Sequence, residues 1–169
     1  MRKEQTLHYL QKLNDKLAEE NATGELYIVG GTAMALLYND NRITYDIDGE
    51  YAPKDSMERL AREIAEEENL PKDWLNDAVS RLGFDFESDT QSVPLDVGDN
   101  LMVSVASPEF MLYLKIWASR RAAHDIADII DLCHYLNIET ELQLYNAISS
   151  FGGVDGAMDL YVEDIVSML

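Results

Sequence analysis

The stretch Leu26-Tyr-Ile-Val-Gly-Gly-Thr-Ala-Met-Ala-Leu-Leu-Tyr38, followed by Thr44-Tyr-Asp-Ile-Asp48, decides the fold of this chain. It is typical of a strand, a glycine turn, a helix and then a second strand that carries two carboxylates. Helical patterns precede residue 20 and dominate after residue 107. This order predicts an α/β (α+β) protein with a small mixed sheet flanked by helices and followed by a C-terminal helical segment.

Two aspartates end the second strand of this stretch. Side chains alternate between the two faces of a strand, so Asp46 and Asp48 are expected on one face, with Ile43, Tyr45 and Ile47 pointing into the fold. Like charges at such positions repel each other unless a proton or a cation relieves them. Because Mg²⁺ binds through one or two carboxylates and takes further ligands from water and phosphates, the pair predicts a site for Mg²⁺ or Mn²⁺. The alternative is two solvated acids on an edge strand.

The glycine pair lies between the first strand and the helix. Gly30 and Gly31 permit a positive φ and a close approach of a phosphate to the backbone, and amides that open a helix over residues 32–38 favour an anion. We expect Gly30 and Gly31 to cradle a phosphate group, with Thr32 adding a hydroxyl. An ordinary strand-to-helix turn is the alternative.

Three further stretches carry polar residues in recognisable patterns. They are Leu70-Pro-Lys-Asp-Trp-Leu-Asn-Asp77, Ala106-Ser-Pro-Glu-Phe-Met-Leu-Tyr-Leu-Lys115 and Arg120-Arg-Ala-Ala-His-Asp-Ile-Ala-Asp128. With the Gly-Gly turn and the Asp-x-Asp strand, the chain resembles the DNA polymerase β-like nucleotidyltransferase superfamily. Within it, the chain is most similar to the bacterial branch of abortive-infection and toxin–antitoxin nucleotidyltransferase-like proteins.

The resemblance implies an activity and roles for further residues. It implies transfer of a nucleoside monophosphate from a metal-bound nucleoside triphosphate (NTP) to a hydroxyl of a protein, an RNA or a small molecule. Lys115 would contact phosphate, and Asp125 would orient or deprotonate the acceptor. His124 stands where the family usually has a basic residue before this aspartate. From helical spacing alone, Lys115 and Asp125 border apolar faces, whereas Asp128 is expected to point away from its face.

Polymerase-type transfer commonly uses a third acid on a neighbouring strand, and the strand expected at residues 101–105 contains none. Asp77, Glu87, Asp96 and Asp125 are candidates. A non-catalytic binding protein with the same fold, such as a component of a toxin–antitoxin pair, is therefore the alternative function, with a toxin or antitoxin as its partner protein.

The composition limits the partners. Thirty-two acidic and 13 basic residues give a formal charge of −19, so bulk DNA or RNA binding is disfavoured. A local basic patch is still compatible with this charge, and its candidate residues are Arg42, Lys115, Arg120 and Arg121. Arg42 is also assigned to the nucleotide-binding residues.

No apolar run approaches the roughly 18 to 20 residues that a membrane helix needs. Neither a signal peptide nor a cysteine pair is visible, and Cys133 is the single cysteine, so we expect a cytoplasmic protein.

The hydrophobic pattern also predicts the elements. At 169 residues we expect one compact unit with a nucleotidyltransferase-like core over 1–107 and a helical segment over 108–169 packed on it. The expected helices span residues 3–20, 32–38, 56–68, 71–81, 108–121, 124–136, 141–148 and 158–168. Strands are expected at 25–29, 43–48, 84–87 and 101–105, with a loop over 90–100.

Overall fold

The computed structural model describes residues 1–118 and 122–169. The chain divides into two compact units, and each is described by itself. The first unit comprises residues 1–86 and 91–106, and the second comprises residues 87–90 and 107–169. Arg120 and Arg121, two members of the expected basic patch, lie outside the described residues.

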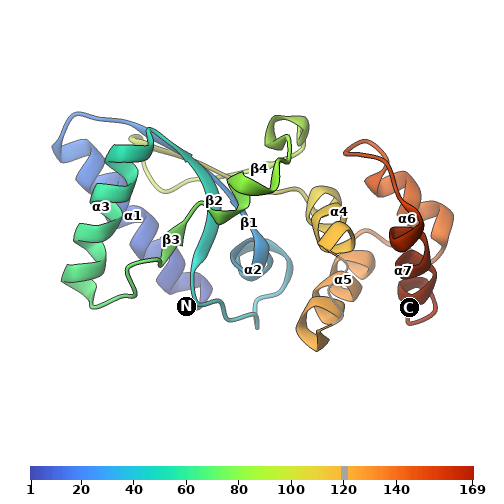
Figure 1. Cartoon of the computed structure of the whole chain (residues 1–169). Coiled ribbons are helices and arrows are strands. Elements are labelled where there is room, and N and C mark those ends of the chain that lie inside the picture. Colours follow the sequence, from blue (N-terminus) through green and yellow to red (C-terminus); the bar gives the residue numbers. More distant parts are fainter. Residues whose placement is uncertain (119–121) are drawn as a thin grey trace. The chain divides into compact units, whose positions relative to one another are not determined.

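A mixed five-stranded sheet forms the centre of the first unit (Figure 1). Its strand order is β3-β2-β1-β5-β4. The bounds are Gly24–Val29 for β1, Ile47–Ala52 for β2, Leu75–Asn76 for β3, Val93–Leu95 for β4 and Leu101–Val105 for β5. β1 pairs antiparallel with β2 and parallel with β5, while β3 is parallel to β2 and β4 is antiparallel to β5. The prediction of a mixed sheet with flanking helices is confirmed.

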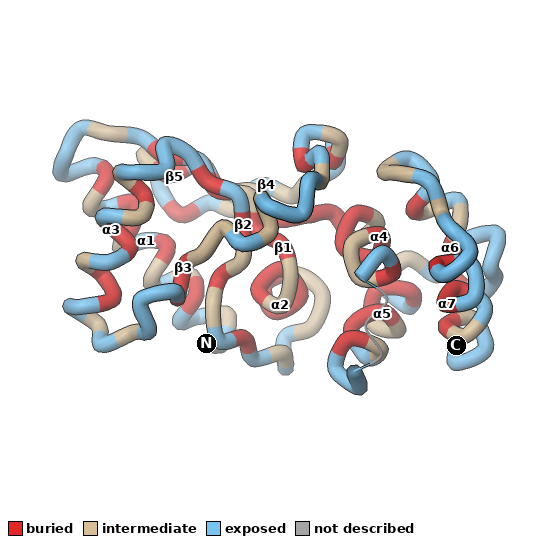
Figure 2. Tube along the Cα trace, viewed as in Figure 1, coloured by how far each residue is buried: buried red, intermediate tan, exposed pale blue. Residues whose placement is uncertain are grey.

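Two long helices pack on the apolar side of the sheet. Helix α1, Lys3–Glu19, contacts α3, Lys54–Glu68, and these two helices contact β5 and β2 respectively. Figure 2 shows buried positions recurring along both helices. Leu10, Leu13 and Leu17 of α1 are buried, as are Leu26 and Ile28 of β1.

The glycine pair begins the third helix of this unit. Helix α2 spans Gly30–Ala33 and continues as a π-helical turn, η1, over Met34–Tyr38, so the helix begins two residues before the predicted start. Its last residue is tied to the sheet, because the Tyr38 hydroxyl donates to the carbonyl oxygen of Ala106 at 2.6 Å. The end of η1 therefore lies beside the C-terminal end of β5, and α2 begins directly after β1.

Several element predictions were wrong where the chain is polar or the elements are short. The strand predicted at 43–48 begins at Ile47, and the helix predicted at 71–81 is β3 followed by a 3₁₀ turn, η2, Ala78–Leu82. The segment 84–87 contains a 3₁₀ turn, η3, Phe86–Ser88, instead of a strand, and the predicted loop contains β4. Two-residue and three-residue strands form through pairing with neighbours and carry too little periodicity to be recognised.

Four helices build the second unit. They are α4, Pro108–Ala118; α5, Ala123–Tyr135; α6, Glu141–Ile148; and α7, Gly156–Val166. α4 contacts the three others, and α5 and α6 also contact α7. The predicted start of α4 is confirmed: Ser107 accepts from the amide of Phe110 at 3.2 Å, and Pro108 is the first helical residue. None of the described helices combines the length and apolar composition needed to cross a membrane.

Candidate active site

The two predicted metal ligands lie at the start of β2. Ile47 is fully buried and donates its amide to the carbonyl oxygen of Trp74 at 2.7 Å, which begins the strand between Asp46 and Asp48. Ile43 and Tyr45 are 48% and 90% exposed, so the prediction that they point into the fold was wrong. The alternating pattern starts only at Ile47 because the preceding residues form a loop.

Two buried hydroxyls fix the backbone at Asp46. The hydroxyls of Thr32 and Thr44 approach its carbonyl oxygen at 2.6 and 2.8 Å. Thr32 is 1% exposed and Thr44 is 7% exposed. The hydroxyl of Thr32, which was expected to meet a phosphate, therefore serves in this structure to join the first turn of α2 to the Asp46 loop.

The side chain of Asp46 is held by a residue that sequence reasoning missed. The amide nitrogen Nδ2 of Asn76 donates to Asp46 Oδ2 at 3.2 Å, and Asn76 Oδ1 accepts from the amide of Ala78 at 3.1 Å. Asn76 lies on β3 directly opposite Asp48 on β2. Its only signal in the sequence was a single amide after Trp74 and Leu75, in a segment whose spacing fitted a helix better.

The electrostatics of the pair match the expected repulsion. The pKa of Asp46 is raised, first because the carboxyl is partly buried and then because of the negative charges of Asp48 and Asp73. The hydrogen bond from Asn76 opposes this rise. Ionised Asp46 is therefore in an unfavourable environment, which a nearby cation would improve.

The glycine turn lies against the same aspartates. Gly30 has a φ of +68°, a conformation that glycine adopts without strain, and a β-carbon placed there would lie 3.1 Å from Asp48 Oδ2. A β-carbon on Gly31 would lie 3.4 Å from Thr44 Oγ1 and 3.9 Å from Arg42 Nη2. The structure thus brings Gly30, Gly31, Arg42 and Asp48 together with Asp46 around the start of α2.

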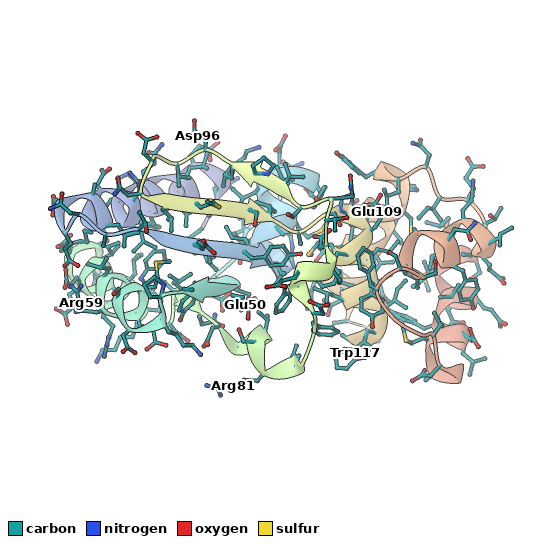
Figure 3. All side chains as sticks on the ribbon, turned by 90° about the horizontal axis from the view of Figure 1, so that it is seen from above. Glu50, Arg59, Arg81, Asp96, Glu109 and Trp117 are labelled. Atoms are coloured by element: carbon teal, nitrogen blue, oxygen red, sulfur yellow. The ribbon has the colours of Figure 1, made fainter. Side chains whose placement is uncertain are left out.

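Two candidates for a third acid, Asp77 and Asp96, belong to the first unit and do not join this group. Asp77 forms an ion pair with Lys54, whose hydrogen bond and charge lower the pKa of Asp77. Asp96 follows β4 at one edge of the sheet. Figure 3 labels Asp96 and also Glu50, which lies on β2, the strand that carries Asp48. Across the sheet, Leu95, which precedes Asp96, is level with Leu26 of β1, whereas Asp48 is paired with Val29 of β1. These two positions on β1 are three residues apart, which is roughly 10 Å along a strand.

The other two candidates, Glu87 in η3 and Asp125 in α5, belong to the second unit. Among the described residues, no group of three or more histidine, cysteine, aspartate or glutamate side chains could hold a metal ion.

The second unit holds a separate buried cluster of charges. Lys115 Nζ on α4 lies 2.8 Å from Asp128 Oδ2 and 3.4 Å from Asp125 Oδ1, both on α5. The side chains of Lys115 and Asp125 are 12% exposed and that of Asp128 is 3% exposed. The prediction that Asp128 points away from the buried face of its helix was wrong. Its carboxylate is buried against the ammonium group of Lys115, which neutralises its charge. His124 Nε2 lies 3.3 Å from Asp125 Oδ2, at the exposed side of the cluster.

Comparison of the sequence with curated proteins gave no match. A model of one protein family matches residues 5–151, which include the acid pair of the first unit and the charged cluster of the second. That family is described as a nucleotidyltransferase of unknown function (DUF6036). The match covers most of the chain, and the chain therefore belongs to this nucleotidyltransferase family.

Proposed function

We propose that this protein is a metal-dependent nucleotidyltransferase that moves a nucleoside monophosphate from an NTP to a hydroxyl of an acceptor. The observation that carries the proposal is the arrangement of Asp46 and Asp48 beside the glycine turn of α2 and Arg42. Family membership supports the reaction class, whereas the metal, the acceptor and the residue roles are inferred from the arrangement.

The acid pair fits a divalent cation. Carboxylate oxygens are the ligands that Mg²⁺ and Mn²⁺ accept, and the charge of Asp48 already raises the pKa of Asp46. A divalent cation bound there would offset negative charge on the triphosphate. Asp46 and Asp48 would hold it, and the two threonine hydroxyls on the Asp46 carbonyl keep the ligand in place.

The start of α2 supplies groups that bind phosphate. Gly30 and Gly31 leave the backbone accessible, and Arg42 Nη2 lies beside the position where a side chain on Gly31 would be. A guanidinium group binds phosphate through parallel hydrogen bonds and keeps its charge at neutral pH. In this proposal these groups hold the triphosphate with its α-phosphorus oriented toward the acceptor.

The reaction follows from that placement. The hydroxyl oxygen of the acceptor forms a bond to the α-phosphorus, the bond from that phosphorus to the bridging oxygen breaks, and pyrophosphate leaves with the electron pair. The hydroxyl proton goes to a base. The resemblance to the superfamily assigns the base role to Asp125 and a phosphate contact to Lys115, and both assignments rest on that resemblance. The net charge of −19 favours a protein or small-molecule acceptor over bulk nucleic acid.

One observation favours the alternative of a non-catalytic binding protein. Among the described residues of the first unit, no third acid completes a metal-binding group with the aspartate pair. A protein that keeps the fold without turnover, such as one component of a toxin–antitoxin pair, would show this pattern.

Transfer of label separates the two functions. Each of the common NTPs, labelled on the α-phosphate, is incubated with the protein, Mg²⁺ or Mn²⁺ and cell extract, and labelled protein, RNA and small molecules are then resolved. We expect transfer by the wild type and a loss of roughly a hundredfold or more in the Asp46→Asn, Asp48→Asn double variant.

Glu25→Gln, which changes an exposed acid on β1 four rows from Asp48, is the matched control and should transfer normally. Equal transfer by the double variant would remove the aspartates from the site. No transfer by the wild type under any of these conditions would favour the binding protein.

A further inference from the structure

Asn76 donates a hydrogen bond from its neutral side-chain amide to the acid pair. Both ends of its amide are used: Nδ2 donates to Asp46 Oδ2 at 3.2 Å and Oδ1 accepts from Ala78 at 3.1 Å. The second bond fixes which end of the amide faces the aspartate, because an acceptor must point at the Ala78 N–H. The orientation of Asn76 is therefore set by the backbone that follows β3.

The strand pairing places Asn76 where it can act on the ligands. Asn76 is paired with Asp48 across the parallel β2–β3 ladder, and Trp74 accepts from Ile47 at 2.7 Å just before it. β3 consists of only two residues. The two residue pairs between β2 and β3 place the side-chain amide of Asn76 next to the acid pair.

Asp46 is constrained from two directions. Thr32 and Thr44 hold its backbone carbonyl, and Asn76 holds one oxygen of its carboxylate. A group that hydrogen-bonds a metal ligand from behind orients it, and loss of such a group typically lowers metal affinity by about 10- to 100-fold. The hydrogen bond from Asn76 to Oδ2 therefore sets the orientation in which the carboxylate would meet a cation.

We propose that Asn76 is a positioning residue of the nucleotidyl-transfer site, which orients the Asp46 carboxylate so that it binds the divalent cation. The inference rests on the proposed function, because it assigns Asp46 to the metal. It adds a residue on β3 to the site residues that the sequence predicted.

The test is Mn²⁺ binding, measured by the loss of the free-ion electron paramagnetic resonance signal, with and without ATP. Asn76→Leu removes both hydrogen bonds and keeps a similar volume, and Asn76→Ala is a milder second variant that adds no bulk. We expect both to weaken Mn²⁺ binding in the presence of ATP by about 10-fold or more. Binding of ATP without metal should stay within about twofold of the wild type, since Asn76 acts through Asp46.

Asn100→Leu is the matched control. Asn100 also makes a side-chain amide hydrogen bond, to the carbonyl oxygen of Ala22 at 2.9 Å, at the end of the sheet where β5 begins. Its loss should lower the melting temperature to a similar extent and leave Mn²⁺ binding unchanged. A merely structural role of Asn76 would give the same result for the two positions.

The outcomes separate this inference from the proposed function. Unchanged Mn²⁺ binding in the folded Asn76 variants, together with lost binding in Asp46→Asn, would overturn the inference and leave the metal site standing. Absence of Mn²⁺ binding by the wild type with ATP would overturn both. Weakened binding in Asn100→Leu equal to that in the Asn76 variants would also overturn the positioning role.

Discussion

At the scale of single residues, Asp46 is held by hydrogen bonds in an environment that is unfavourable for its charge. Its carbonyl accepts from two threonines and its carboxylate accepts from Asn76, yet partial burial and the charges of Asp48 and Asp73 disfavour its ionised form. Interactions that hold a charged group where it is electrostatically unfavourable are typical of functional sites. The same feature gives a measurable dependence of stability on pH.

We expect Asp46→Asn to stabilise the folded protein increasingly as the pH rises. The pKa of Asp46 in the folded protein lies above its ordinary value of 3.8, so the folded state binds more protons than the unfolded state between the two values. The wild type therefore loses stability as the pH rises through this window, and asparagine removes that loss. Urea unfolding of both proteins between about pH 4 and 7 measures the difference.

Asp77→Asn serves as a control of opposite sign. Lys54 lowers the pKa of Asp77, so this carboxylate contributes stability above its ordinary pKa and loses it as the pH falls through the lowered value. The Asp77 variant should therefore be less stable than the wild type at neutral pH and approach it in acid. A difference between Asp46→Asn and wild type that does not change with pH would contradict the assigned environment of Asp46.

At the scale of elements, the charged cluster of Lys115, Asp125 and Asp128 joins α4 to α5. All three side chains are mostly buried, so each needs the opposite charge of its partners. Removal of Lys115 would leave two buried carboxylates without their cation.

Lys115→Met should lower the free energy of unfolding by about 3 to 5 kcal/mol. Chemical denaturation at neutral pH measures the loss. Lys54→Met is the control, since Lys54 pairs with Asp77 while being 58% exposed, and it should cost no more than about 1 kcal/mol. Adding Asp125→Asn and Asp128→Asn to Lys115→Met should recover part of the stability. An equal cost for the two lysines would show that the cluster is not effectively buried.

At the scale of the whole molecule, net charge is the property with the clearest consequence. Thirteen basic residues stand against 32 acidic ones, and several of the basic side chains form ion pairs within the protein, among them Lys12, Lys16, Arg59 and Lys115. Few cations are therefore left to neutralise the phosphates of a nucleic acid.

We expect binding to arbitrary duplex DNA or RNA to be weaker than about 1 μM at physiological salt and to fall further as salt is added. Fluorescence anisotropy over a salt series measures this. If one RNA end is the acceptor, its binding should depend on Arg42, so that Arg42→Ala weakens it more than Lys72→Ala, a change at an exposed lysine. Submicromolar affinity for unrelated sequences would contradict the charge argument.

The sequence by itself determined the parts of this protein that depend on local pattern. Leucines at helical spacing predicted α1, the run before Gly30 predicted β1, and Ser107 with Pro108 predicted the start of α4. It also predicted that Gly30, Gly31 and the two aspartates would come together, because a short strand–turn–helix–strand unit leaves little freedom in how its ends meet.

Only the tertiary structure decided the features that depend on partners distant in sequence. β3 exists because it pairs with β2, so Asn76 could be found only once the ladder had formed. Asp128 is buried because Lys115 on another helix neutralises its charge. A prediction from helical periodicity treats every aspartate as exposed, because it does not know which side chains the aspartate contacts. The physical reason is the same in both cases: a polar group or a short strand is stabilised by its partner, and the sequence near it does not identify that partner.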